Sequence, residues 1–240
     1  MSTVKEEAIK LRQNIDNVYE AGKKAEYDRF WDTYQDFGNR TAYQYAFAGN
    51  SWVNLIHELK YPIKFPTEAS ETTRNCSGMF KYFNRGNKDT LYDFSEICKK
   101  IDFSNCRTAT ELFSNARVDN VTVDFSGATR LTDTFNGADG GSGIKSITIT
   151  VTEKCTYYYD MFNYQSALTN LIFTEGSVIA AAIGFPQSKL LSSESVQSII
   201  DALQDRTGQT ALKVTFHADV IANLTEEQTA AILAKNWQIG

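Results

Sequence analysis

The sequence predicts a repeat solenoid, in which short parallel strands are joined by irregular or helical returns, with an N-terminal helix and an α/β C-terminal cap. Three observations lead to this fold class. A motif closed by phenylalanine recurs along the chain, short strands follow it, and both ends carry helical patterns. The expected division is an N-terminal helix over residues 1–38, a repeat region over 39–190 and a cap over 191–240.

The clearest repeat joins IDFSNCRTATELF (101–113) to VDFSGATRLTDTF (123–135), which align without a gap at an offset of 22 residues. The matched positions are Ile101 with Val123, Phe103 with Phe125, Ser104 with Ser126, Cys106 with Ala128, Ala109 with Leu131 and Phe113 with Phe135. The closing phenylalanine recurs at Phe47, Phe80, Phe113, Phe135, Phe162 and Phe185. One such unit cannot bury its apolar face alone, so we expect neighbouring units to stack.

Short strands are expected at residues 101–103, 121–125, 147–151 and 171–173. They recur without a two-residue hairpin turn between them, which favours parallel pairing. The glycine-rich stretch 137–143 is expected to be a loop insertion. Period-two alternation directs one set of residues outward. This set comprises Asp102, Thr122, Asp124, Thr148, Thr150, Ile172, Lys213 and Thr215.

The N-terminal segment, residues 4–34, predicts a helix with a coiled-coil seam. The seam residues are Val4, Ala8, Leu11, Ile15, Val18, Gly22 and Ala25. Two interpretations stay open. The seam is a short oligomerising stalk built on Ala8, Leu11, Ile15 and Val18, or the helix folds back and covers the open edge of the first repeat with Tyr27, Phe30, Trp31 and Tyr34.

The C-terminal segment predicts a helix over residues 195–204, ended by Thr207-Gly208, and a strand over 212–216. Thr225 followed by Gln228 has the spacing of a capping box and predicts the start of a last helix. Trp237 and Ile239 are then expected to close the core.

Composition argues against several classes of protein. The net charge of −5 and the pI of about 5.2 disfavour a broad nucleic-acid or anionic-membrane surface. The N-terminus lacks the apolar core of a secretory signal, and no apolar stretch approaches the roughly 18–20 residues of a membrane span. We therefore expect a soluble protein, made in a cytoplasm, without nucleic-acid binding or membrane insertion.

Cysteine and histidine provide no clear metal or cofactor site. Cys76, Cys98, Cys106 and Cys155 include no CxxC pair, and we expect buried, reduced side chains, with two disulfides as the alternative. His57 and His217 lack a second ligand at metal spacing. We accordingly expect no metal and no cofactor.

Catalytic motifs are also lacking. In GADGGSGIKS, Ile144 separates Gly143 from Lys145, so the lysine does not stand where a phosphate loop needs it. The acidic pair Asp32 and Asp36 is expected on a solvated helix face and not in a glycosidase cleft. We assign no catalytic residue and expect a protein that is not an enzyme, with a wall-degrading hydrolase as an alternative.

Three consecutive tyrosines, Tyr157 to Tyr159, are the most suggestive binding feature. In an extended chain Tyr158 would point inward while Tyr157 and Tyr159 point outward, and exposed tyrosines favour recognition, including stacking on sugars. Core packing of the cluster is the interpretation that we favour, with recognition as the alternative. The candidate ligand-binding residues are Asp102, Thr122, Asp124, Thr148, Thr150, Tyr157, Tyr159 and Lys213.

The repeat unit with a central aromatic resembles the BspA-like leucine-rich repeats of bacterial surface and phage-encoded proteins. Residues 17–49 are similar to the opening segment of repeat proteins encoded among Firmicutes prophage tail genes, and residues 191–216 and 224–240 are similar to their closing segment. The resemblance covers about residues 17–240. The middle of the chain departs from the standard pattern by its few leucines and many Thr, Tyr and Phe, which leaves repeat boundaries between Trp52 and Phe80 open.

The resemblance implies a tail-associated virion protein that recognises a host-surface protein or glycan as its receptor. Its partners would be other tail proteins and, through the N-terminal seam, further copies of the chain. Two alternatives stay open, a purely structural virion or scaffold part and a bacterial surface-type interaction protein.

Overall fold

The computed structural model describes residues 22, 25, 48–49, 63–65, 74–87, 90–137 and 143–240. The chain divides into two compact units, residues 1–36 and residues 37–240. In the first unit the described residues, Gly22 and Ala25, are helical and exposed. The predicted seam residues Ala8, Leu11, Ile15 and Val18 lie outside the described residues, as do Phe47 and His57.

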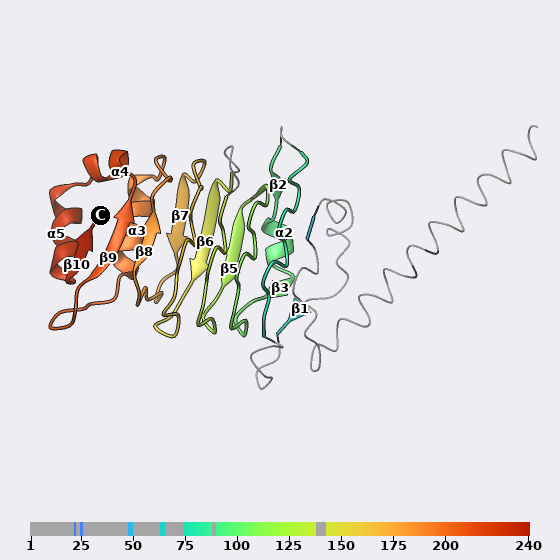
Figure 1. Cartoon of the computed structure of the whole chain (residues 1–240), viewed down its shortest axis with the longest axis horizontal. Helices are drawn as coiled ribbons and strands as arrows, with labels where there is room; N and C mark the ends of the chain where they lie inside the picture. Colours follow the sequence, from blue (N-terminus) through green and yellow to red (C-terminus); the bar gives the residue numbers. More distant parts are fainter. Residues whose placement is uncertain are drawn as a thin grey trace, which may run out of the picture. The chain divides into compact units, whose positions relative to one another are not determined.

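The central sheet of the second unit consists of three parallel strands, β5 (Val121–Asp124), β6 (Ser146–Thr150) and β7 (Asn170–Phe173). The register places Val121 beside Ile147 and Ile147 beside Leu171. Figure 1 shows these strands side by side. Buried and more accessible residues alternate along each strand, as period two requires.

Three smaller parallel sheets complete the strand inventory of the described residues. β1 (Ile63–Lys64) pairs with β3 (Ile101–Asp102), and β2 (Tyr92–Asp93) pairs with β4 (Val118–Asp119). β8 (Ile183–Phe185), β9 (Leu212–Phe216) and β10 (Trp237–Ile239) form a sheet in the order β10-β9-β8. A short helix, α2 (Ser95–Cys98), precedes β3.

The expected leucine-rich-repeat-like solenoid is wrong, although the short parallel strands themselves are present. The strands belong to four separate small sheets and do not close into one continuous stack. Asn120, at φ 52°, turns the chain between β4 and β5 and divides two of the sheets. At the other side, the neighbour of β7 is helix α3 (Ser193–Ala202) instead of a further strand.

Two serine hydroxyls of α3 end the central sheet. The Oγ of Ser195 accepts a hydrogen bond from the N–H of Leu171 at 2.8 Å, and the Oγ of Ser198 accepts one from the N–H of Phe173 at 2.8 Å. These are donors that a fourth strand would otherwise satisfy. The side chains of a helix therefore take the place of a strand backbone. The spacing of the sequence repeats does not predict this replacement.

The recurring phenylalanines stack on one another in the core. Phe113 lies between Phe80 and Phe135, with ring centroids 5.3 and 5.6 Å away, and Phe135 lies 5.4 Å from Phe162. The stack continues through Phe185 to Phe216. Each of these rings is at most 3% exposed. Burial of one such side chain contributes about 1.5–3 kcal/mol, and each aromatic pair adds about 0.5–1.5 kcal/mol.

A second backbone row faces the strands across this core. It is formed by residues 74–84, 107–117, 129–137 and 155–164, which we call the turn row. Alternate N–H groups of one segment donate to carbonyl oxygens of the next, as from Glu111 to Thr132 at 2.9 Å and from Asp133 to Tyr159 at 3.0 Å. Phe125 directly follows β5, and its ring lies 6.5 Å from that of Phe135, so the end of β5 is joined to the turn row inside the core. The outward side chains of the strands and those of the turn row therefore lie on opposite sides of the core.

The C-terminal part contains α3, α4 (Ala218–Ala222) and α5 (Glu226–Ala234). The predicted capping box of Thr225 and Gln228 is confirmed at the start of α5. The Lys235 ammonium group donates to the carbonyl oxygens of Ile200, Asp201 and Leu203 at 2.8–2.9 Å, and so caps the C-terminal end of α3. Trp237 is 1% exposed, and its indole donates to the carbonyl oxygen of Gln204.

The cysteines differ from the expectation of four reduced side chains. Cys76 of the turn row and Cys106, which immediately precedes the next turn-row segment, form a disulfide, with their Cα atoms 6.5 Å apart. Their segments align side by side, a pairing that the cysteine spacing alone does not reveal. Cys98 and Cys155 are free. Across the described residues, no helix has the length and hydropathy needed to cross a membrane.

Candidate functional site

The strand-borne candidates other than Lys213 lie on the β5–β7 side, where several already serve local structure. The Oδ1 atoms of Asp102 and Asp124 accept the N–H of Ser104 and Ser126, which fixes the turns after their strands. The hydroxyl of Thr150 is bonded to that of Thr174 at 2.8 Å. Thr122 is exposed and Thr148 is half-buried on the same side. These residues do not meet the tyrosine candidates, which belong to the turn row.

The tyrosine candidates form an exposed stack. Tyr157 and Tyr159 are 41% and 60% exposed, their ring centroids are 6.2 Å apart, and the rings are inclined by 29°. The guanidinium of Arg130 lies over the ring of Tyr157, 4.6 Å from its centroid. Tyr158 between them is 3% exposed. The predicted alternation, outward for Tyr157 and Tyr159 and inward for Tyr158, is confirmed.

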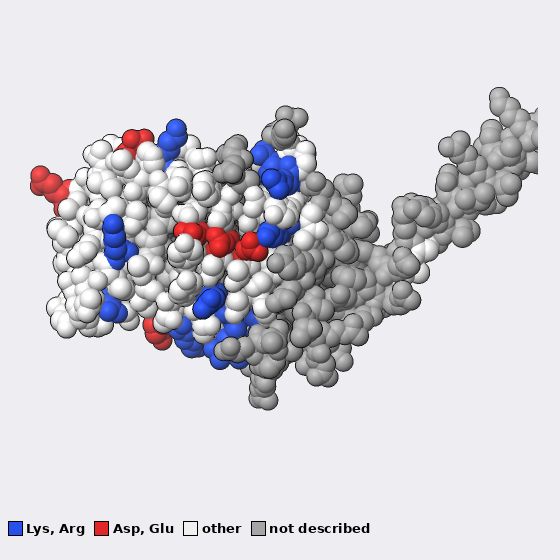
Figure 2. Space-filling view, viewed as in Figure 1, with Lys and Arg blue, Asp and Glu red and all other residues white. Residues whose placement is uncertain are grey.

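A row of carboxylates runs beside this stack. Glu111, Asp133 and Asp160 occupy equivalent positions of successive turn-row segments and share a left-handed backbone, with φ of 50–55°. Burial, followed by the charges of Asp160 and Glu111, raises the pKa of Asp133. At one end the ammonium of Lys81 pairs with Glu111 at 2.6 Å. Figure 2 shows such a row of acidic side chains, with a basic one at its end, across the middle of the visible face.

Sequence reasoning missed this row, although a signal for it is present. Each of the three carboxylates stands two residues before a phenylalanine anchor, as in ELF, DTF and DMF. The corresponding residue before Phe80 is Gly78, which shares the left-handed conformation at φ 64°. A conformation that suits Gly, Asn and Asp therefore places side chains in line on the surface.

A cavity of about 290 Å³ opens where the turn row meets β8 and β9. Its walls include Tyr159, Asp160 and Asn163 from the last turn-row segment and Gly184, Lys213 and Thr215 from the two strands. The structure thus brings Tyr159 and Lys213 together, two candidates more than fifty positions apart in the sequence. The negative charge of Asp160, and its hydrogen bond with Tyr159, raise the pKa of that tyrosine.

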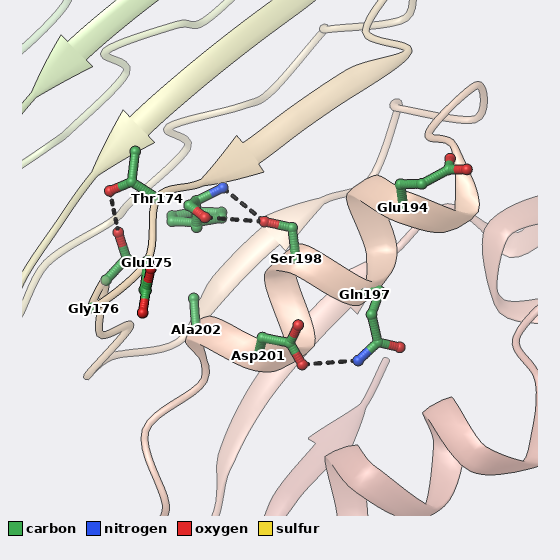
Figure 3. A pocket seen from close by; sticks show the side chains of 10 residues that line it. Thr174, Glu175, Gly176, Glu194, Gln197, Ser198, Asp201 and Ala202 are labelled. Atoms are coloured by element: carbon green, nitrogen blue, oxygen red, sulfur yellow. Dashed lines mark hydrogen bonds between the residues drawn. The ribbon is translucent and has the colours of Figure 1, made fainter.

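A second cavity, of about 500 Å³, lies beside α3 at the end of β7 (Figure 3). The turn from Thr174 to Ser177 and the α3 residues Gln197 and Asp201 line it. Figure 3 shows Gln197 hydrogen-bonded to Asp201, a contact of 2.8 Å. The Thr174 and Ser177 hydroxyls are likewise bonded to each other. Because these groups satisfy one another, the cavity at Tyr159 is the better candidate site.

Metal and histidine chemistry has little support in the described residues. No cluster of three His, Cys, Asp or Glu side chains that could hold a metal ion occurs among them. His217 caps the N-terminus of α4, where its Nδ1 accepts the N–H of Asp219 at 3.1 Å. The candidate site is therefore one of exposed aromatic, carboxylate, amide and ammonium groups, a set suited to binding.

Comparison with known proteins gave no relatives. No protein-family model matches the chain, and no characterised protein and no solved structure is significantly similar to it.

Proposed function

We propose that the chain is a non-enzymatic binding component of a bacteriophage or prophage tail, and that it contacts a ligand on the host surface. The observation that carries the binding function is the exposed stack of Arg130, Tyr157 and Tyr159 beside a cavity. Large aromatic side chains are usually withdrawn from water, and exposed Tyr and Arg are enriched at recognition surfaces. The tail assignment rests on the resemblance of residues 17–49, 191–216 and 224–240 to segments of prophage tail proteins.

The test is binding of fluorescently labelled protein to intact Firmicutes cells, with substitutions that preserve the turn row. Thr110 and Thr132 occupy the positions equivalent to Tyr159, and Thr108 occupies one equivalent to Tyr157. The double variant Tyr157→Thr/Tyr159→Thr therefore follows a pattern that the row already accommodates. We expect it to lose cell binding by at least about thirtyfold, since truncation of even one such anchor costs roughly 2 kcal/mol or more.

The matched control is Tyr82→Asn, which removes an exposed tyrosine from a distant turn-row segment and places Asn at a φ of 61° that it tolerates. Its cell binding should equal that of the wild type. A wild-type protein that binds no cells, in both monomeric and oligomeric preparations, would contradict the proposal and would favour a purely structural virion part.

A further inference from the structure

The cavity at Tyr159 is a gap in an otherwise continuous backbone row. Within the turn row, the carbonyl oxygens of Tyr157, Tyr159, Met161 and Asn163 accept bonds from the preceding segment. The alternate N–H groups of Tyr158 and Asp160 are therefore directed toward the following segment. None of the described residues accepts a hydrogen bond from either group. The row of main-chain bonds thus stops at the residues that line the cavity.

The opposite wall of the cavity shows the same interruption. Val214 and Phe216 of β9 exchange backbone bonds with Gly240, on the β10 side, so the backbone of Thr215 faces β8. In the parallel pairing of Gly184 with Thr215, this alternation leaves the N–H and C=O of Gly184 directed away from β9, toward the cavity. Main-chain hydrogen-bond donors and a main-chain acceptor therefore both border the cavity.

The two walls are nevertheless firmly joined below the gap. The rings of Phe162 and Phe185 lie 4.9 Å apart in the core, and the side-chain amide oxygen of Gln187 accepts the N–H of Tyr164 at 3.0 Å. The gap is consequently a preformed feature with a fixed floor. A preformed, concave site with a few placed polar groups is what small-ligand binding requires.

The chemistry of the walls selects the class of ligand. Asp160 offers acceptors, Lys213 offers donors, and Asn163, Thr215 and the free main-chain groups offer both. The charges of Asp160 and Lys213 balance. Beside them lies the aromatic side chain of Tyr159, a residue that is 60% exposed. Sugar rings combine hydroxyls that both donate and accept with C–H faces that stack on aromatics, so they complement each wall.

The size of the site points the same way. At about 290 Å³ the cavity stands at the lower end of the range of about 300–1,000 Å³ for ligand pockets, which accommodates a sugar residue. A protein partner would instead need about 800 Å² of surface around an apolar centre. Resting on the proposed function, we infer that the cavity between residues 158–163 and strands β8–β9 is the subsite for an uncharged saccharide unit of the surface ligand.

The first experiment uses the purified full-length protein and the methyl glycosides of glucose, galactose, N-acetylglucosamine and rhamnose, each up to 50 mM. Binding is followed by saturation-transfer NMR and by the chemical shifts of the protein. We expect at least one glycoside to bind and to shift signals of the cavity residues. If none of the four binds the wild type, the inference is wrong, whatever the protein does on cells.

Two variants locate the binding. A Cβ at Gly184 makes only ordinary contacts, 3.5 Å to Thr215 and 3.7 Å to Pro186, so Gly184→Val keeps the strand while its methyl groups enter the cavity. Asp160→Asn keeps a side chain suited to φ 51° and removes the carboxylate. Each should weaken glycoside binding by at least about tenfold, and Tyr82→Asn should leave it within about twofold. Unchanged binding in both cavity variants would overturn the inference.

The cell-binding assay separates this inference from the proposed function. Periodate destroys the vicinal diols of surface glycans, and proteases remove surface proteins. Loss of binding after periodate treatment, with retention after protease treatment, supports a saccharide ligand. Loss after protease treatment alone would refute the saccharide and leave host-surface recognition standing.

Discussion

The stacked phenylalanines should act as coupled neighbours, and a double-mutant cycle measures that coupling. Phe113 and Phe135 are fully buried, their rings are inclined by only 5°, and their centroids are 5.6 Å apart. Phe135 also stacks on Phe162, so Phe135→Leu removes two stacked pairs. At about 0.5–1.5 kcal/mol for each pair, the single substitution should cost about 1–3 kcal/mol beyond the change in buried area. Urea unfolding followed by circular dichroism gives the free energies.

The coupling energy discriminates stacking from simple burial. For Phe113→Leu combined with Phe135→Leu, we expect non-additivity of about 0.5–1.5 kcal/mol, because each single variant already loses the shared pair. The control cycle is Phe80→Leu with Phe162→Leu, two stack members that do not touch each other; it should be additive within about 0.3–0.5 kcal/mol. Equal coupling in the two cycles would refute the ring-stacking explanation and leave burial alone.

Three further substitutions test other contacts by the same unfolding measurement. Lys235→Met should lower the free energy of unfolding by about 2–3 kcal/mol, because three carbonyl oxygens at the end of α3 lose their donor. The control Lys189→Met, at an exposed lysine, should cause no measurable loss. Equal effects of the two substitutions would contradict the capping role of Lys235. Burial and neighbouring carboxylates raise the pKa of Asp133, so the folded state binds its proton more tightly and stability falls as the pH rises through that pKa. Asp133→Asn should therefore stabilise the protein at pH 7 by no more than about 1 kcal/mol, given partial solvent screening. This gain in stability should disappear at pH values below the ordinary carboxyl pKa of 3.8. A gain that persists below that pH would contradict an electrostatic origin of the effect. Cys76→Ala combined with Cys106→Ala should cost about 3–4 kcal/mol, since the disulfide closes a loop of 30 residues, and treatment of the wild type with a reductant should reproduce the loss.

Sequence reasoning succeeds for structural features that are determined by one type of residue recurring at regular positions. The anchors from Phe80 to Phe185 are such a case, because a large apolar ring at each recurrence has no stable place except the core. The alternation around Tyr158 is another, since an extended backbone reverses side-chain direction at every residue. The strands β5, β6, β7 and β9 follow from the same periodicity and lie within one residue of their predicted bounds.

The features that sequence reasoning missed depend on how distant segments meet. The end of the central sheet depends on the packing of α3 against β7. The sequence around Ser195 and Ser198 does not predict that their hydroxyls replace the backbone of a strand. The cavity depends on the register between Asp160 and Gly184, which come from segments joined by a long connection. The candidate set consequently included Tyr159 and Lys213 but not their neighbours. It also included Asp102 and Asp124, whose carboxylates hold turns.

The serine pair on α3 also determines where this architecture can lengthen. The outer edge of β7 has its amides committed at Leu171 and Phe173, so a strand from another chain finds no free donors at those two positions. A duplicated segment cannot be added after β7 without displacing α3. It can enter beside β6, where each neighbour on either side is already a parallel strand. Relatives of different length should accordingly differ in the number of strands before β7 and share a closing part from α3 onward, which their structures would reveal directly.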